Sequence, residues 1–328
     1  MNILIAHISD FSLWNAPEWL GHRLHQTFPQ HRIKQLRDYR DLDSAISDAE
    51  VLVGSSLTAD QFANGTHIRW IHSPAAAVHQ LLLPALIESD VLLTNASSVH
   101  GPVVAEHALA LMFCLAKGLR RAFEYQSQHV WAKQQMWQNG GAQRPAELAG
   151  KTLLVVGMGH IGSHLTRLSR AIGMHVIGVR AHPERGGEAD EVFGPDALDP
   201  LFERADYIVL AAPVTADSER RFGKDAFAAM RSSAYLINVS RGDLIDEEAL
   251  VHALCTSQIA GAALDVFQEE PLPSYSPLWT VQNLVMTPHT AGFTDRMWER
   301  HYDLIADNIR RYDAGSPLTG LVSKRLGY

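Results

Sequence analysis

Short hydrophobic segments alternate with amphipathic helical patterns along the first hundred residues of the chain. Pro17–Phe28 and Leu42–Ala49 carry the helical pattern. Five hydrophobic segments are predicted to form strands: Asn2–Ile8, Arg32–Leu36, Val51–Gly54, Ile68–His72 and Val91–Thr94. Because strands that alternate with helices are joined by crossover connections, this order predicts a parallel α/β sheet.

A second α/β series begins at Lys151, after a long apolar helix predicted from Pro102 to about Gly118. Helical segments separate most of its strands, which is typical of a doubly wound sheet. Six strands are predicted here: Thr152–Val156, Met174–Val179, Tyr207–Ala212, Tyr235–Val239, Ala260–Asp265 and Leu284–Thr287.

Two further segments complete the pattern. Tyr125–Gln143 has weak periodicity and fits either an excursion near an active site or an oligomer contact. The chain's tryptophans at 131, 137 and 298 are expected mainly to pack, with lining of a substrate pocket as the alternative. A final helix is predicted to return the chain to the first domain, because one stripe of it is hydrophobic: Trp298, Tyr302, Ile305, Ile309 and Tyr312.

Composition agrees with two globular domains. The chain has 328 residues, 46% hydrophobic and 20% charged, and its net charge of −8 offers no basic surface for nucleic acid. The most apolar stretch, Ala105–Leu119, contains three polar residues and is not predicted to span a membrane. With no signal-peptide pattern at the N-terminus, a cytoplasmic location is expected. No cysteine–histidine cluster suggests a metal site.

Gly157, Gly159 and Gly162 form a G-x-G-x-x-G motif between a predicted strand and a predicted helix. In a dinucleotide-binding domain such glycines allow a tight turn, close approach of the backbone to the pyrophosphate, and close packing of the helix on the strand. The N–H groups that begin the following helix then face the phosphates. In this context the motif predicts a dinucleotide site.

The next predicted strand ends before Arg180, and His182 and Arg185 follow shortly after. Domains that prefer NAD place a carboxylate at this strand end, where it accepts hydrogen bonds from the ribose. An arginine would instead bind the 2′-phosphate of NADP through charge-assisted hydrogen bonds. We therefore expect NADP (NADPH) as the cofactor, with NAD as the alternative.

Polar residues follow three of the later strands, at the ends where open α/β sheets bind ligands. Reduction of a 2-oxo acid needs a guanidinium to hold the carboxylate and polarise the carbonyl, and a proton donor for the alkoxide that develops. It also needs a carboxylate to orient that donor and favour its protonated form. Arg241, His289 and Glu270 fit these three roles.

The glycine motif, INVSRGDLIDEEAL, GAALDVFQEEPLP, TPHTAG and TNASSVHGPVVAEHALAL together resemble the D-isomer-specific 2-hydroxyacid dehydrogenase family, and the likeness covers almost the whole chain. The resemblance implies a homodimer of chains with two Rossmann-like α/β domains. The flavodoxin-like substrate domain would comprise residues 1–100 and 293–328, with the NAD(P)-binding domain, residues 101–292, inserted into it.

The resemblance also implies roles for single residues. Arg241 would bind substrate, His289 would be the acid/base with Glu270 as its partner, and Asp265 would bind the nicotinamide carboxamide. Pro213, Thr215 and Ser218 resemble the family's loop beneath the adenosine half, with serine in place of threonine at 218. The predicted cofactor contacts are Gly157, Gly159, His160, Ile161, Gly162, Arg180, His182, Arg185, Pro213, Ser218, Val239, Asp265 and Gly292.

The family's carboxylate-binding loop corresponds to residues 73–79, where the amides of Ala76 and Ala77 would contact substrate alongside Arg241 and His289. Ala77 replaces the usual glycine. Phosphoglycerate-type members tend to carry an arginine in the loop after the third strand, and residues 53–57 contain no cation here. We therefore expect a small 2-oxo acid such as glyoxylate or hydroxypyruvate. A phosphoglycerate-type dehydrogenase and a dinucleotide-sensing, corepressor-like protein stay open as alternatives.

Overall fold

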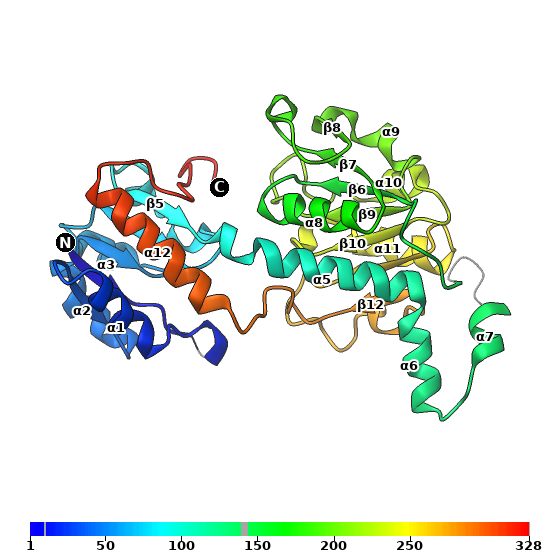
Figure 1. Cartoon of the computed structure of the whole chain (residues 1–328), viewed down its shortest axis with the longest axis horizontal. Helices are drawn as coiled ribbons and strands as arrows, with labels where there is room; N and C mark the ends of the chain where they lie inside the picture. The colour runs from blue at the N-terminus through cyan, green and yellow to red at the C-terminus, as the bar shows by residue number, and fades with distance from the viewer. Residues whose placement is uncertain (10, 139–143, 328) are drawn as a thin grey trace. The chain divides into compact units, whose positions relative to one another are not determined.

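The computed structural model describes residues 1–9, 11–138 and 144–327, and the chain divides into two compact units (Figure 1). Unit 1 combines Met1–His100 with Phe293–Tyr328, and unit 2 is the continuous segment Gly101–Gly292. Each unit is an α/β domain with a wholly parallel sheet, five-stranded in unit 1 and seven-stranded in unit 2. The predicted fold class is therefore confirmed.

Unit 1 has the strand order β2-β1-β3-β4-β5. All five predicted strands are present, with shifted ends: β1 (Asn2–Ile5), β2 (Arg32–Gln35), β3 (Val51–Val53), β4 (Trp70–Ser73) and β5 (Leu92–Asn95). One face packs against α1 (Glu18–Thr27) and α12 (Met297–Asp313). The other packs against short helices, α2 (Leu42–Ala45), α3 (Ala59–Asn64) and α4 (Pro84–Ile87). Both faces are thus covered, as a parallel sheet requires.

The hydrophobic stripe of α12 behaves as predicted. Trp298, Tyr302, Ile305 and Ile309 are buried in the core that contains Ile3 and Leu24, and Tyr312 packs at its border. The Trp298 indole N–H also donates to the Leu13 carbonyl at 3.0 Å. The last helix therefore completes the core that the first residues of the chain begin.

Unit 2 has the strand order β12-β11-β10-β9-β6-β7-β8. The six predicted strands are β6 (Thr152–Val156), β7 (His175–Val179), β9 (Tyr207–Leu210), β10 (Tyr235–Asn238), β11 (Gly261–Leu264) and β12 (Leu284–Met286). The seventh, β8 (Glu191–Phe193), is a half-buried edge strand that the sequence analysis did not predict. Three residues are too few to show the alternation by which a strand is recognised.

Successive strand residues in unit 2 face opposite layers. Leu153 and Val155 point into the core beneath α5 (Ser97–Lys117) and α8 (His160–Ala171). Leu154 and Val156 point into the opposite core. Three helices cover that face: α9 (Leu198–Phe202), α10 (Lys224–Ala229) and α11 (Glu247–Cys255). The sheet is thus doubly wound, and its strand ends are free for ligand contacts.

Helix α5 begins earlier than predicted. Proline favours the first turn of a helix, so Pro102 suggested a start there. The helix instead starts at Ser97, whose amide donates to the Asn95 side chain, and it continues through Pro102. By length and composition α5 could span a membrane, but its apolar residues, including Ala105, Ala108 and Met112, are buried in the core of unit 2. Its hydrophobicity is that of a core helix.

The excursion after α5 contains α6 (Leu119–Ser127) and α7 (Lys133–Gln138), and neither helix has a fully buried residue. Trp131 is 92% exposed and Trp137 is also exposed, so neither packs in the core of its own chain, and packing at an interface stays a prediction. Trp298 alone of the three predicted packing tryptophans is buried. Residues 139–143 of the predicted excursion lie outside the described residues.

Candidate active site

The glycine motif connects β6 to α8. Gly157 has φ +104°, and a Cβ there would lie 2.5 Å from the Ala212 nitrogen, so only glycine fits. A Cβ on Gly162 would lie 2.1 Å from the Gly157 oxygen, which explains how closely α8 approaches the turn. A Cβ on Gly159 would meet no described atom within 4 Å. This open space at the start of α8 fits the pyrophosphate of a dinucleotide, because internal packing does not explain the glycine.

Arg180 follows β7 at the same edge of the sheet. Its guanidinium Nη1 donates to the Gly186 carbonyl at 2.7 Å, which leaves its other N–H groups for a ligand. Arg185 is exposed, and the His182 ring lies 3.3 Å from the Glu184 carboxylate. These positions suit a 2′-phosphate, although Glu184 adds a negative charge to the segment.

The loop after β9 is organised by Ser218. Its hydroxyl accepts from the Thr215 amide at 2.8 Å and lies 3.1 Å from the Pro213 carbonyl. The hydroxyl of Ser218, which stands where the family has threonine, therefore shapes the predicted adenosine loop. Val239, the predicted cofactor contact that follows β10, is buried.

Arg241 is placed by a tight turn after β10. The buried Asn238 side chain donates to the Arg241 carbonyl at 2.8 Å and accepts from the Ser240 amide at 3.1 Å. A Cβ on Gly242 would lie 2.0 Å from the Phe267 carbonyl carbon, so the two backbones touch. The exposed Arg241 is thus carried beside the segment that leads from β11 to Glu270.

Glu270 and His289 are hydrogen-bonded, with 2.6 Å between Oε2 and Nδ1. The other Glu270 oxygen, Oε1, accepts from the Phe267 amide at 2.9 Å, which fixes the carboxylate. With Nδ1 directed at Glu270, Nε2 is the nitrogen that can exchange a proton with a ligand. The His289 side chain is 52% exposed and therefore accessible.

His289 has left-handed backbone geometry, with φ +54°. For a non-glycine residue this costs on the order of 1 kcal/mol. The His289 amide donates to the Asp265 carbonyl at 2.9 Å and to the Thr287 carbonyl at 3.0 Å. These two hydrogen bonds therefore hold the His289 backbone in a conformation that is otherwise unfavourable, and this conformation fixes where the imidazole lies.

The side chain of Asp265, which is 1% exposed, accepts hydrogen bonds from the residues on both sides of His289. Its Oδ1 accepts from the Thr287 hydroxyl at 2.6 Å and the Thr290 amide at 2.9 Å, and Oδ2 accepts from the Ala291 amide at 2.9 Å. A carboxylate has further acceptor capacity, so its contact with the nicotinamide carboxamide stays a prediction. Holding the residues around His289 is an additional role.

His107 of α5, for which no role was predicted, joins this network. Its Nε2 lies 3.0 Å from the Thr287 hydroxyl and 3.6 Å from the Asp265 carboxylate. Burial lowers the pKa of His107, and the Asp265 charge partly opposes that shift. No local pattern marks such a residue, because its partners are far along the chain.

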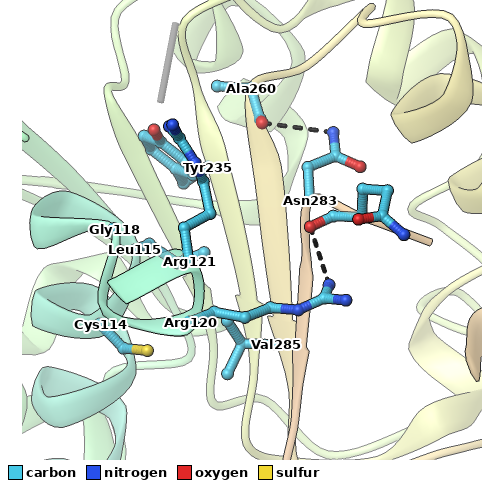
Figure 2. Close-up of a pocket in the computed structure, with 10 residues that line it drawn as sticks. Cys114, Leu115, Gly118, Arg120, Arg121, Tyr235, Ala260, Asn283 and Val285 are labelled. Carbon is cyan, nitrogen blue, oxygen red and sulfur yellow. Dashed lines mark hydrogen bonds between the residues drawn. The ribbon is translucent and has the colours of Figure 1, made fainter. Parts of the chain in front are cut away.

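A small cavity of about 30 Å³ lies at the opposite, amino-terminal edge of this sheet (Figure 2). Arg120, from α6, donates there to the carbonyls of Gln282 at 2.8 Å and Leu284 at 2.6 Å, which anchors the start of β12. Tyr235 and Asn283 line the cavity at or before strand starts. Ligands bind at the carboxyl ends of such strands, so this cavity is not the active site.

In unit 1, the predicted carboxylate-binding loop follows β4. The Ala76 and Ala77 amides have no hydrogen-bond partner among the described residues, and Ala76 is exposed. The Ala75 carbonyl accepts from the Ala96 amide at 3.2 Å, and the Ala76 carbonyl accepts from the Asn95 side chain at 2.9 Å. The loop thus offers unpaired N–H donors, which a carboxylate needs.

The family model for the D-isomer specific 2-hydroxyacid dehydrogenase, NAD binding domain, matches residues 109–291. The chain belongs to the D-isomer specific 2-hydroxyacid dehydrogenase family. The predicted family is therefore confirmed.

Relatives within the family carry different names. A glyoxylate/hydroxypyruvate reductase B from Citrobacter koseri is 32% identical, over 89% of this chain and 91% of that protein. A D-3-phosphoglycerate dehydrogenase from Methanocaldococcus jannaschii is 31% identical, over 86% of this chain and 53% of that protein. The chain spans about half the length of the phosphoglycerate dehydrogenases it matches.

A solved structure is similar over the whole chain. It is an NADPH-dependent glyoxylate/hydroxypyruvate reductase from Sinorhizobium meliloti in complex with NADP and sulfate, with a TM-score of 0.80 and 25% identity. The alignment covers 100% of this chain and 99% of that chain. The two-domain architecture is therefore that of the family.

Proposed function

We propose that this dehydrogenase reduces a small 2-oxo acid, such as glyoxylate or hydroxypyruvate, with NADPH. The observation that carries the proposal is the 2.6 Å contact between His289 and Glu270, at the same sheet edge as the glycine motif. An accessible imidazole oriented by a carboxylate beside a dinucleotide site is the arrangement that carbonyl reduction requires.

The described residues divide the chemistry among them. A bound nicotinamide supplies the hydride that adds to the carbonyl carbon. The Arg241 guanidinium binds the acid and polarises its carbonyl, and His289 Nε2 gives a proton to the carbonyl oxygen. Glu270 stabilises the imidazolium that precedes this transfer. The Ala76 and Ala77 amides of unit 1 donate to the substrate carboxylate. Oxidation of the 2-hydroxy acid reverses these steps.

A substrate panel tests this proposal. NADPH oxidation is followed at 340 nm with glyoxylate, hydroxypyruvate, pyruvate and 3-phosphohydroxypyruvate, about 1 mM each, a common upper range for enzyme KM values. Saturable turnover is expected with one or more of the unphosphorylated acids. Absence of turnover with all four would contradict the reductase and favour the dinucleotide-sensing alternative.

A phosphoglycerate-type activity is the second candidate, because two of the relatives carry that name. Residues 53–57 contain no cation to bind a phosphate, which argues against it. A kcat/KM for 3-phosphohydroxypyruvate at least tenfold above the other acids would establish this candidate instead.

Replacing Arg180 with alanine is expected to raise the Kd for NADPH about 10- to 100-fold and to leave that for NADH nearly unchanged. The reason is loss of a charge-assisted contact to the 2′-phosphate, which NADH lacks. Fluorescence titration of the reduced cofactors measures both constants. Arg221→Ala, at a half-buried arginine paired with Asp199 in the same unit, is the control. An equal loss for both cofactors would refute the NADP preference.

We also propose a cytoplasmic homodimer that associates through α6 and α7. Phe123 is 60% exposed, Trp131 is more exposed still, and Trp279 borders a hollow of about 560 Å³ together with Phe123. Clusters of exposed aromatic residues are typical of protein interfaces.

Light scattering is expected to give twice the chain mass of 36.3 kDa for the wild type. The double variant Phe123→Ser, Trp131→Ser should shift that mass towards the monomer at micromolar concentration. Trp19→Ser, at an exposed tryptophan of unit 1, should have no effect. A monomeric wild type, or a double variant that is as dimeric as the wild type, would count against this interface.

A further inference from the structure

In the loop proposed to bind the substrate carboxylate, the Ala75 and Ala76 carbonyls have hydrogen-bond partners among the described residues, whereas the Ala76 and Ala77 amides have none. These carbonyls face the start of α5, where the Ala96 amide meets the Ala75 carbonyl and the Asn95 side chain meets the Ala76 carbonyl. Two consecutive peptides are thus held from one side.

These contacts of the carbonyls also determine the directions in which the amides point. In a trans peptide the C=O and N–H groups point in opposite directions. The Ala76 carbonyl and the Ala77 amide belong to one peptide, so holding that carbonyl against Asn95 directs the Ala77 N–H away from α5. The Ala76 N–H is directed likewise by the Ala75 carbonyl. Both are the donors without partners among the described residues.

We infer that Asn95 is a positioning residue for the carboxylate-binding loop, with its side-chain N–H setting the direction in which the Ala77 amide points. The inference rests on the proposed function, because it assigns the loop the substrate carboxylate. A glycine at position 77, with no Cβ, would leave the peptide between residues 76 and 77 free to rotate. In this chain the alanine at 77 restricts that rotation, and the hydrogen bond from Asn95 sets the orientation of the peptide.

The Asn95 side chain makes two hydrogen bonds, and different substitutions affect them differently. Its Nδ2 donates to the Ala76 carbonyl at 2.9 Å, and its Oδ1 accepts from the Ser97 amide at 3.3 Å, at the start of α5. Asn95→Asp keeps an acceptor for Ser97 but places an oxygen against the Ala76 carbonyl. Asn95→Ser keeps a residue favoured at helix starts, is too short to reach Ala76, and adds no charge.

The experiment measures steady-state kinetics with NADPH and the best acid of the panel for the wild type and both variants. We expect KM for the acid to rise about tenfold in Asn95→Ser and further in Asn95→Asp, with kcat within about threefold of wild type. The Kd for NADPH should not change. The methyl ester of the same acid, which lacks the carboxylate charge, should show no comparable rise in KM.

Asn308→Ser is the matched control, because Asn308 is a buried asparagine of the same unit. Its side chain donates to the Thr319 carbonyl at 3.0 Å and accepts from the Thr319 amide at 2.7 Å. This variant should lose thermal stability and keep the wild-type KM. An increase in KM as large as that of Asn95→Ser would mean that general loosening of unit 1 is responsible, and would overturn the inference.

Three other outcomes would also overturn it. An unchanged KM in Asn95→Ser, with an active wild type, would reject the positioning role and leave the proposed function standing. A rise in Asn95→Asp alone would show that the added charge repels the substrate. If the wild type reduces none of the acids, the proposed function fails first and the inference fails with it.

Discussion

Replacing His289 with asparagine is expected to lower kcat by a factor of about 10²–10⁴, while NADPH binds as it does to the wild type. The imidazole is the only described group that Glu270 orients for proton transfer, and asparagine cannot donate a proton to an alkoxide. Asparagine is chosen over alanine because it tolerates left-handed geometry, which His289 adopts with φ +54°. Stopped-flow and steady-state NADPH oxidation measure the loss.

His129→Asn is the control for this substitution. His129 is an exposed histidine of unit 2 with nearly the same φ, +58°, so it tests the backbone effect without the chemistry. Glu270→Gln should lower kcat less, by about 10- to 100-fold, because glutamine can still contact Phe267 and His289 but carries no charge. A His289→Asn enzyme with near wild-type kcat would make the acid/base assignment wrong.

Acid is expected to destabilise unit 1 strongly, because it holds four histidines close together, three of them buried and His7 half-buried. They come from the residues after β1 (His7), from β4 (His72), from the first turns of α5 (His100) and from α12 (His301). The His100 and His301 rings are 5.9 Å apart, and His301 is 4.9 Å from Trp298. His72 Nε2 and His301 Nδ1 have no hydrogen-bond partner among the described residues.

Burial lowers the pKa of His7 from 6.5 to about 4 and that of His72 to about 3, and it lowers the pKa of His100 and His301 as well. The neighbouring imidazoles act in the same direction, and Arg300 is the cation near His100. In the unfolded chain these groups protonate near pH 6.5. Between that pH and the folded pKa values the unfolded state binds more protons, so the free energy of unfolding falls as pH falls.

The loss should amount to several kcal/mol between pH 7.5 and pH 4, since each pKa unit corresponds to about 1.4 kcal/mol. Urea unfolding followed by circular dichroism at pH 7.5, 6, 5 and 4 measures it. His301→Leu should flatten the dependence, because one titrating group is removed, whereas His182→Gln at an exposed site should not. The same pH dependence in His301→Leu and the wild type would exclude His301 as one of its causes.

Most strand segments and the candidate catalytic residues could be predicted from the sequence. In a parallel sheet every strand ends at the same edge, so residues that follow predicted strands are brought to that edge without knowledge of packing. This is why Arg241, Glu270 and His289 could be assigned roles before any contact was known. The glycine motif was equally readable, because Gly157 and Gly162 satisfy local steric demands.

Other features were decided by contacts between distant segments. The Asp265 carboxylate accepts hydrogen bonds from the residues that follow His289, and His107 of α5 contacts Thr287. Asn95 orients the peptides of the loop that follows β4. Trp131, whose place in the core or at an interface the sequence left open, is exposed in the chain.

The sequence by itself therefore determined the fold class, the family and the predicted acid/base pair, because periodicity and strand-end position are local properties. Only the tertiary structure decided which amides are left unpaired and which polar groups orient the site. Hydrogen-bond partners and burial depend on segments that meet in space, and no spacing along the chain records those meetings.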